Sequence, residues 1–478
     1  MALAAFTLAV RAGEGDWISL FDGQSLQGWR ASENTNSFTV QDGLIVAEGP
    51  RSHLFYVGPD GPAGFTNFEF AAEVLSRPGA NSGIYFHTDF QASGWPGQGF
   101  EVQINNTQPQ HDNYYEFKQT GSLYGVRNLY KSIVRDDAWF NLNIRVTGPR
   151  VQVRLDDTLV VDYIEPAAGP GGDAGARRLS RGTFALQGHD AASKVCFKNL
   201  RVRPLPAAVA PAAAGERPVV DDYYRQVLQF NEQNFPLVNF HAHLKGGLTL
   251  PEALAQARQS GVNFGIAVNC GVGFSITNDA GIEAFLKTMQ GQPAFVGMQA
   301  EGREWRKLFS PATVSRFDYI FTDAMTFFDR EGRRTRLWLK DEVTVGDKQA
   351  FMDMLVARTL AILNEEPIDI YVNPTFLPEV IAAEYDQLWT PARMQPVIAA
   401  AVQHGVAIEI NARYRIPSLV FLKLAKKAGA KFSFGTNNTG ADVGRVDYCF
   451  EAAKALGLRA DDMFMPKPAG RKPIQLRN

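Results

Sequence analysis

The sequence predicts a multidomain protein in which an all-β sandwich is followed by an α/β seven-stranded (β/α) barrel. Short stretches before residue 205 alternate apolar and polar residues, whereas later apolar runs alternate with helix-like stretches. Ala/Pro-rich sequence without periodicity separates the two halves and is typical of a linker. A chain of 478 residues is also too long for one core. We therefore expect the sandwich at 16–205, the linker at 206–222 and the barrel at 223–478.

The first half has the alternation of period two that is typical of half-buried strands. Clusters of Gly, Pro, Asn and Asp separate the alternating stretches, and Asp156 with Asp157 is expected to form a hairpin turn. Many short strands at this spacing favour two packed sheets. The expected strands are 68–74, 82–87, 99–104, 140–146, 151–155 and 159–162.

The second half alternates strand-like and helix-like stretches, which predicts a parallel barrel with its helices outside. An open doubly wound sheet is the alternative. The first helix is expected at 250–261, because Thr249 and Glu252 have the spacing of a capping box at its start. The expected strands are 237–241, 262–269, 294–299, 319–322, 368–372, 406–410 and 431–434, with further helices at 349–364, 392–404, 418–428 and 443–457.

Polar residues stand at the ends of all seven expected barrel strands. In a parallel barrel these ends form one mouth, which is where such folds keep their sites. Polar residues also cap strands that reach solvent, but seven polar ends are more than capping needs, so we expect a site. The residues are His241, His243, Asn269, Cys270, Glu301, Asp323, Asn373, Glu409, Asn411, Thr436, Asn437 and Asn438.

The pair His241 and His243 stands at the end of the first expected barrel strand. Side chains two apart on a strand point the same way, so the two imidazoles would converge on one point. Neutral imidazole is a common ligand of zinc-type metals, and a chance pair is improbable in a chain with only 7 histidines. The alternative is a pair of hydrogen-bonded histidines at a strand end.

The composition excludes several classes of protein. A formal net charge of −2 gives no electrostatic reason to expect nucleic acid or an anionic membrane as partner. No apolar run reaches the roughly 18 residues of a membrane span. An odd number of cysteines, 3, excludes a disulfide framework. Residues 1–10 resemble the apolar half of a secretory signal, which favours a periplasmic or extracellular protein.

Seven ordered segments in the first half resemble the 3-keto-disaccharide hydrolase domain family. The resemblance spans about residues 16–205 and departs from the family at Asp190, where the family usually has Gly. It implies a concanavalin A-like jelly roll that holds a carbohydrate. The segments are LFDGQSLQGW at 20–29, ANSGIY at 80–85, FEVQI at 100–104, TGSLYG at 120–125, DAWFN at 137–141, GTFALQ at 182–187 and FKNLRVR at 197–203.

The chemistry implied by this resemblance begins with a sugar ketone at C3, which acidifies the C2 proton. A base removes that proton, the C1 leaving group departs, and water then adds. His189 or Glu101 would be the base, and Tyr124 the acid or the donor to the enolate. Each of these residues has the alternative of being a polar residue on a sheet surface. The expected substrate-binding residues are Asn81, Gln103, Gln187 and Trp139.

The second half resembles the polymerase and histidinol phosphatase (PHP) superfamily of metal-dependent barrels, over about residues 235–460. The resemblance rests on His241-Ala-His243 and on Glu301 after a later strand, and it implies that these three bind metal. The chain departs from the family where Asn, Met and Thr replace later ligands. We therefore expect at most one divalent metal of the Zn or Mn type, held by His241, His243, Glu301 and Asp323. The substituted positions are Met325, Asn373, Asn437 and Thr439.

The leading hypothesis is an enzyme that cleaves 3-keto-glycosides by C2 proton abstraction, elimination and hydration, without a nucleic-acid partner or a membrane span. One alternative is a sugar-binding sandwich attached to a metal-dependent phosphoesterase barrel. Another is a non-catalytic lectin with a degenerate barrel. The sequence leaves open the aglycone and whether the chain forms an oligomer.

Overall fold

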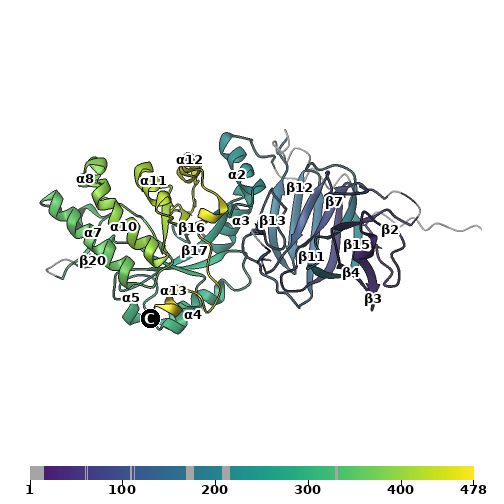
Figure 1. The fold of residues 1–478 in the computed structure, drawn as a ribbon, viewed down its shortest axis with the longest axis horizontal. Helices are drawn as coiled ribbons and strands as arrows, with labels where there is room; N and C mark the ends of the chain where they lie inside the picture. The colour runs from purple at the N-terminus through teal and green to yellow at the C-terminus, as the bar shows by residue number, and fades with distance from the viewer. Residues whose placement is uncertain are drawn as a thin grey trace, which may run out of the picture. The chain divides into compact units, whose positions relative to one another are not determined.

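The computed structural model describes residues 15–59, 61, 63–107, 110–111, 114–167, 177–206, 216–328 and 332–477 (Figure 1). The chain forms two compact units, Met1–Asn234 with Arg258–Gly261 and Phe235–Ala257 with Val262–Asn478. The expected export signal at 1–10 and most of the expected linker, 207–215, lie outside the described residues.

The first unit is a sandwich of two antiparallel sheets, as the sequence predicts. One sheet has the order β13-β12-β11-β6-β15-β4-β3 with β1 paired to β15, and the other has the order β2-β5-β14-β7-β8. A small ladder pairs β9 with β10. The strands are β1 Ile18–Ser19, β2 Trp29–Ala31, β3 Phe38–Gln41, β4 Leu44–Glu48, β5 Ser52–Tyr56, β6 Phe68–Ser76, β7 Ser82–Thr88, β8 Phe100–Ile104, β9 Gln110–His111, β10 Tyr114–Tyr115, β11 Phe140–Thr147, β12 Arg150–Leu155, β13 Thr158–Ile164, β14 Thr183–Gly188 and β15 Lys194–Pro204.

Along each strand, successive side chains point alternately into the core and toward the opposite face of the sheet. On β6 every second side chain is buried, beginning with Phe68, in the pattern that the sequence predicts. The core joins both sheets, since the Phe70 ring of one sheet lies 4.7 Å from the Phe184 ring of the other. On β8 Phe100, Val102 and Ile104 belong to this core, which leaves Glu101 and Gln103 for the other face of the five-stranded sheet.

Two helical segments accompany the sheets in the described residues of 15–234. The 3-10 helix η1 spans Thr35–Ser37, and helix α2 spans Asp222–Glu232. Asp221 caps α2 by accepting a hydrogen bond from the backbone of Tyr224. Leu228 of α2 belongs to the sandwich core, so this helix stands with the first unit and the second begins at Phe235.

The second unit is a closed barrel in which β16-β17-β18-β19-β22-β23-β24 follow one another in parallel. The pairing of β16 with β24 closes it, which confirms the barrel and excludes the open sheet. A separate hairpin, β20–β21, was not predicted. The strands are β16 Val238–His243, β17 Asn263–Cys270, β18 Phe295–Ala300, β19 Tyr319–Thr322, β20 Thr326–Phe328, β21 Arg334–Arg336, β22 Ile370–Tyr371, β23 Ala407–Asn411 and β24 Phe432–Gly435.

Most helices of this unit lie between strands along the chain, and α12, η5 and α13 follow the last strand, β24 (Figure 1). Thr249 and Glu252 form the expected capping box at the start of α3, with each side chain bonded to the backbone of the other. No helix of the described chain is long and apolar enough to cross a membrane. The helices are α3 Leu250–Ser260, α4 Asp279–Thr288, α5 Trp305–Leu308, α6 Pro311–Val314, η4 Lys340–Glu342, α7 Lys348–Glu365, α8 Glu379–Ala382, α9 Tyr385–Leu388, α10 Pro391–His404, α11 Leu419–Lys427, α12 Asp447–Leu456, η5 Ala460–Asp462 and α13 Pro473–Leu476.

Large aromatic rings fill the interior of the barrel. The Phe240 ring lies 5.1 Å from that of Tyr319, whose hydroxyl donates to the carbonyl of Phe240 at 2.6 Å. Gly297 leaves the room that this tyrosine needs, because a β-carbon at that position would collide with the phenol ring. A packed interior leaves the mouth of the barrel as the place for a site.

Candidate functional site

The sandwich has a cavity of about 600 Å³ on the face of the five-stranded sheet that points away from the core. Six of the seven sandwich residues expected from the sequence line it. Trp139 does not, because it precedes β11 of the other sheet, where its exposed ring lies 4.2 Å from the Lys198 ammonium. The lining residues are Asn81, Tyr85, Trp95, Pro96, Gly97, Gly99, Glu101, Gln103, Glu116, Tyr124, Arg177, Gln187 and His189.

Glu101 stands at the centre of a hydrogen-bonded group on this face. The Tyr85 hydroxyl donates to Glu101 Oε2 at 2.8 Å, and Gln187 Nε2 donates to Glu101 Oε1 at 2.9 Å. Burial raises the pKa of Glu101 to about 7, although these two donors lower it. The carboxyl group can therefore both give and accept a proton near neutral pH.

His189 follows β14 and is held by partners on both ring nitrogens. Nδ1 lies 2.7 Å from Asp190 Oδ2, and Nε2 lies 3.3 Å from Asn81 Nδ2. Since Asn81 Oδ1 accepts from Gln103, its amide nitrogen is the donor to His189. The proton of the neutral ring is thus on Nδ1, and Nε2 carries the lone pair.

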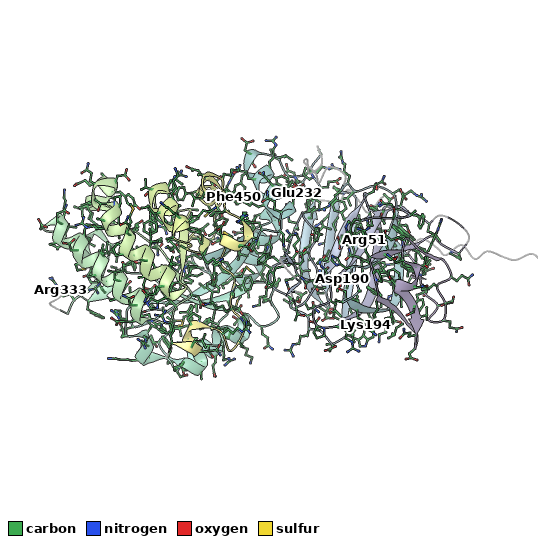
Figure 2. The ribbon with its side chains drawn as sticks, in the orientation of Figure 1. Arg51, Asp190, Lys194, Glu232, Arg333 and Phe450 are labelled. Carbon is green, nitrogen blue, oxygen red and sulfur yellow. The ribbon has the colours of Figure 1, made fainter. Side chains whose placement is uncertain are left out.

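Asp190, which is labelled in Figure 2, follows β14 in the chain. It orients His189 and is itself fixed by its neighbours. The backbone of Ala192 donates to its Oδ1 at 2.8 Å, and the Ser193 hydroxyl donates to its Oδ2 at 3.1 Å. Partial burial tends to raise the pKa of Asp190, but the hydrogen bonds from His189, Ala192 and Ser193 bring it below its ordinary value. A charged carboxylate therefore accepts the Nδ1 proton of His189.

Tyr124 occupies a charged corner of the cavity. Its hydroxyl donates to Glu116 Oε2 at 3.2 Å, and the Lys118 ammonium lies 4.4 Å from the centre of its ring. Arg177 donates from Nη1 to the Tyr124 carbonyl at 2.7 Å and places its guanidinium 5.5 Å from the same ring. Arg177 is thus a fixed positive charge on the wall of the cavity.

Sequence reasoning missed the aromatic and charged residues Tyr85, Trp95, Glu116 and Arg177 of this cavity, besides Pro96, Gly97 and Gly99. Tyr85 could have been found, because β7 and β8 are neighbours and their pairing places it directly opposite Glu101. The Trp95 ring lies 5.1 Å from that of His189, but its loop has no periodic pattern that fixes its direction. Long-range folding brings in Arg177, which no local pattern predicts.

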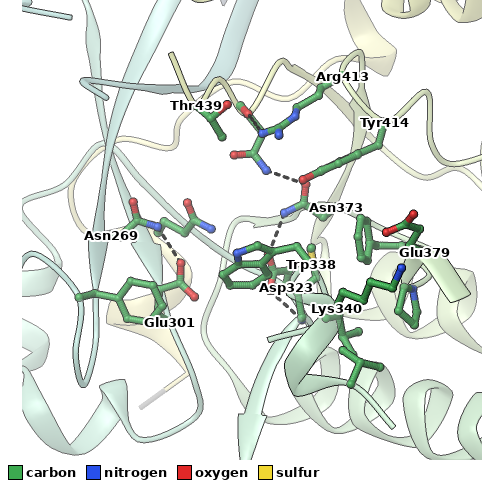
Figure 3. Close-up of a pocket in the computed structure, with 18 of the residues that line it drawn as sticks. Asn269, Glu301, Asp323, Trp338, Lys340, Asn373, Glu379, Arg413, Tyr414 and Thr439 are labelled. Atoms are coloured by element: carbon green, nitrogen blue, oxygen red, sulfur yellow. Dashed lines mark hydrogen bonds between the residues drawn. The ribbon is translucent and has the colours of Figure 1, made fainter. Parts of the chain in front are cut away.

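The barrel mouth has a second cavity, of about 930 Å³ (Figure 3). Residues from the ends of five different strands line it, as expected for a parallel barrel. These are Asn269, Glu301, Asp323, Asn373 and Asn437. His241 and His243 are buried and are not among its lining residues.

The two histidines of β16 each use Nδ1 within the protein. His241 Nδ1 lies 2.6 Å from Glu409 Oε1, and His243 Nδ1 donates to the carbonyl of Ala267 at 2.9 Å. Among the described residues neither Nε2 atom has a hydrogen-bond partner. Burial lowers the pKa of His243 well below its usual range, so this ring is neutral with its lone pair on Nε2.

The two carboxyl groups of the mouth are held by amides. Asn269 donates to Glu301 Oε1 at 2.7 Å, and Asn373 donates to Asp323 Oδ2 at 2.8 Å. Burial, and then the nearby Asp323, raise the pKa of Glu301 to about 8. Burial likewise raises the pKa of Asp323. Both groups are therefore proton carriers held in place by uncharged donors.

The four expected ligands do not form a complete metal site. Free Nε2 atoms on His241 and His243 suit a metal, since a ligating histidine usually donates its other nitrogen to an acceptor. However, within the ranges that the structure describes, no three His, Cys, Asp or Glu residues lie close enough together to hold a metal ion. The donor set as arranged does not fit the expected divalent metal, and no step below uses one.

Residues 16–203 match the family model of the 3-keto-alpha-glucoside-1,2-lyase-like domain. No curated protein matches the chain.

Several solved structures are similar in part. A candidate glycosyl hydrolase from Parabacteroides distasonis ATCC 8503 is 21% identical over 40% of this chain and 95% of its own, with a TM-score of 0.34. The carbohydrate-binding module CBM66 from Bacillus subtilis is 17% identical over 37% of this chain and 96% of its own, with a TM-score of 0.25. Histidinol phosphate phosphatase from Lactococcus lactis subsp. lactis Il1403 is 13% identical over 50% of this chain and 98% of its own, with a TM-score of 0.37.

Proposed function

We propose that this protein cleaves 3-keto-glycosides in the sandwich cavity by removing the C2 proton, eliminating the aglycone and adding water. One observation carries the proposal: a single cavity brings the buried carboxyl group of Glu101 together with the oriented imidazole of His189. The match of residues 16–203 to the lyase-like family supports it. Action outside the cytoplasm, expected from residues 1–10, belongs to the same proposal.

His189 is the base in the first step. Its Nε2 carries the lone pair, because Nδ1–H donates to Asp190 at 2.7 Å. The C2–H bond breaks, the proton moves to Nε2, and the electron pair forms an enolate with the C3 ketone. Asp190 stabilises the imidazolium that results.

Glu101 is the acid in the second step, and Arg177 stabilises the charge of the enolate. The C1–O bond breaks as the enolate collapses to a C1–C2 double bond conjugated with the ketone. The electron pair of the broken bond leaves with the aglycone oxygen, which takes the proton of Glu101. A pKa of about 7 lets Glu101 hold that proton at neutral pH and release it during the reaction.

Hydration returns Glu101 and His189 to the protonation states in which they began. Water attacks C1 and gives a proton to Glu101, while the imidazolium of His189 returns a proton to C2. The products are the free aglycone and a 3-keto sugar. No covalent bond to the protein forms, so the carboxylate pair of ordinary glycosidases is not required.

Turnover of a 3-keto-glucoside in D₂O tests this reaction. The His189 imidazolium, whose side chain is 28% exposed, exchanges its proton with solvent before it returns one to C2. Elimination and hydration therefore place deuterium at C2 of the released sugar, whereas direct hydrolysis at C1 leaves the C2 hydrogen in place. We expect C2-deuterated product by NMR at early times, beyond the exchange seen without protein. The corresponding unoxidised glucoside should stay intact, because its C2 proton is not acidic.

Matched variants locate the reaction. His189→Ala should abolish deuterium incorporation and release of the aglycone, and Trp139→Ala, outside the cavity, should keep both. Product without deuterium would contradict the elimination route. Sugar binding without any turnover would instead support the lectin alternative.

A further inference from the structure

The cavity at the barrel mouth has two sides of different chemistry (Figure 3). Its floor is made of amide and carboxyl groups at strand ends. The wall is mostly apolar, with Lys340, Thr344 and Glu379 among its residues, and it comes from residues 337–345, which follow β21, and 376–380, which follow β22. The floor includes Asn269, Gln299, Glu301, Asp323 and Asn373, and the wall includes Leu337, Trp338, Val343, Val345, Phe376 and Val380.

The floor contains an amide that a ligand can contact. Gln299 lines the cavity and is only 6% exposed, and its Oε1 atom has no partner within hydrogen-bond geometry among the described residues. Its side chain also interacts with that of His243, which is buried and does not line the cavity. A ligand group that donates a hydrogen bond can pair with Gln299 Oε1.

The wall exposes apolar side chains that a soluble protein usually covers. Trp338 is 40% exposed and Val380 is 64% exposed, and both line the same cavity. Exposed apolar side chains that gather at a concave site indicate a ligand surface. A tryptophan face also binds the flat faces of rings well.

We propose that the barrel mouth is a second ligand site, which binds a glycoside with an apolar or aromatic aglycone. The hydroxyl groups of the sugar lie on the floor and the aglycone lies against the Trp338 wall. A volume of about 930 Å³ is large enough for such a two-ring ligand. The site needs no metal, and it does not depend on the chemistry of the sandwich.

A phosphate ester fits this floor less well than a sugar. Lys245 and Arg413 at the rim of the cavity would attract an anion. The floor, however, is made of neutral amides and of the carboxyl groups of Glu301 and Asp323, and a carboxyl group that ionises there repels a doubly charged phosphate. Sugar hydroxyls donate and accept at the same time, so they satisfy both the acceptors and the amides.

Equilibrium binding by calorimetry tests the proposal in the full chain carrying Glu101→Gln. The probes are p-nitrophenyl glucoside, methyl glucoside and inorganic phosphate, each with protein treated with EDTA. We expect the aryl glucoside to bind more tightly than the methyl glucoside. Trp338→Ala should weaken binding of the aryl glucoside about tenfold and leave that of the methyl glucoside nearly unchanged.

Gln299→Met should weaken binding of both glucosides, because it removes the acceptor on the floor. Trp139→Ala is the matched control, since it removes an exposed tryptophan of the sandwich that is outside both cavities. Unchanged binding in Trp338→Ala and Gln299→Met would overturn the proposal, as would a preference for phosphate. A failure of 3-keto-glucoside turnover would leave these binding results standing, so the two proposals fail separately.

Discussion

At the scale of single residues, burial decides what Glu101 can do. An exposed glutamate is ionised at neutral pH, but the cavity raises the pKa of Glu101 to about 7 even though Tyr85 and Gln187 donate to it. The same environment holds the carboxyl group against the sheet. One side chain can thus protonate the leaving oxygen and later deprotonate water.

The protonation of Glu101 predicts the pH dependence of turnover. The acid must carry its proton during elimination, so kcat/KM for an alkyl 3-keto-glycoside should fall as pH rises through about 7. Glu101→Gln should lower turnover of this substrate by about 100-fold or more. A p-nitrophenyl 3-keto-glycoside, whose leaving group needs no proton, should lose less and lack the decline near pH 7. Equal losses for the two leaving groups would show that Glu101 is not the acid.

Asp190 acts through His189 as a positioning residue. Replacing it by the glycine usual in the resembled family, Asp190→Gly, removes the acceptor of the Nδ1 proton. We expect kcat to fall about tenfold or more, with little change in KM, because substrate contacts remain.

A double-mutant cycle separates this role from a merely structural one. His189→Ala with Asp190→Gly should be no slower than His189→Ala alone, since both changes disable the same base. Additive losses in the double variant would mean that Asp190 contributes in another way. Circular dichroism spectra of all three variants check that each is folded.

At the residue scale, the sequence predicted six residues that line the sandwich cavity and one, Trp139, that lies elsewhere. Glu101 and Gln103 share a face because they are two apart on a strand, a relation that needs no structure. Trp139 stands in an equally clear motif segment, but its strand, β11, belongs to the other sheet. A motif fixes order along the chain, whereas sheet membership depends on long-range pairing.

At the scale of elements, strand periodicity was the reliable signal. The expected strand 319–322 coincides with β19, but the expected strand 368–372 shortens to Ile370–Tyr371 in β22, because apolar residues beside a strand are also buried. The hairpin β20–β21 and the segment 337–345 were not predicted. The apolar residues of the segment 337–345 line a cavity, so this segment lacks the periodic pattern of packed elements.

The close packing of strand β7 against the Glu101 side chain can be tested by a substitution at Gly83. Gly83 lies on β7 opposite Gln103, and a β-carbon at Gly83 would collide with the Glu101 carboxyl group. Gly83→Ala should therefore displace this group and lower kcat/KM about tenfold or more, without unfolding the sheet. Gly440→Ala is the matched control, because a β-carbon there meets nothing within 4 Å. Equal activity of the two variants would contradict the placement of Glu101.

At the scale of the whole molecule, the sequence pattern predicted both the sandwich and the barrel, because it changes from alternation of period two to alternating strand-like and helix-like stretches. Seven strand and helix alternations suit an open sheet as well as a barrel, and only the pairing of β16 with β24 decides between them. The prediction of a metal site likewise depended on contacts that the sequence does not show. The residue types at strand ends predicted the carboxyl groups of Glu301 and Asp323 at the mouth. The amides that donate hydrogen bonds to them come from other strands, which only the closed barrel brings near.

The stability of the barrel should depend on pH through Glu366. Trp305 Nε1 donates to Glu366 Oε2 at 2.7 Å and Arg303 Nε lies 3.2 Å from Glu366 Oε1, yet burial outweighs both and raises the pKa of this carboxyl group to about 7 from an ordinary value of 4.5. The folded state therefore holds a proton that the unfolded state releases, and stability falls as pH rises from about 4.5 to 7. The loss is at most about 3 kcal/mol. Glu366→Gln keeps an acceptor for Trp305 and cannot ionise, so it should remove this dependence.

Calorimetric unfolding at pH 5 and pH 8 measures the effect. In a unit of this size 1 kcal/mol corresponds to about 2–4 °C in Tm. We expect the barrel transition of the wild-type chain to fall by several degrees more than that of Glu366→Gln between the two pH values. Glu451→Gln is the matched control, because this carboxyl group is exposed and pairs with Arg415 instead of Arg303. If wild type and Glu366→Gln lose equal stability, Glu366 is ionised in the folded barrel and its burial does not hold a proton.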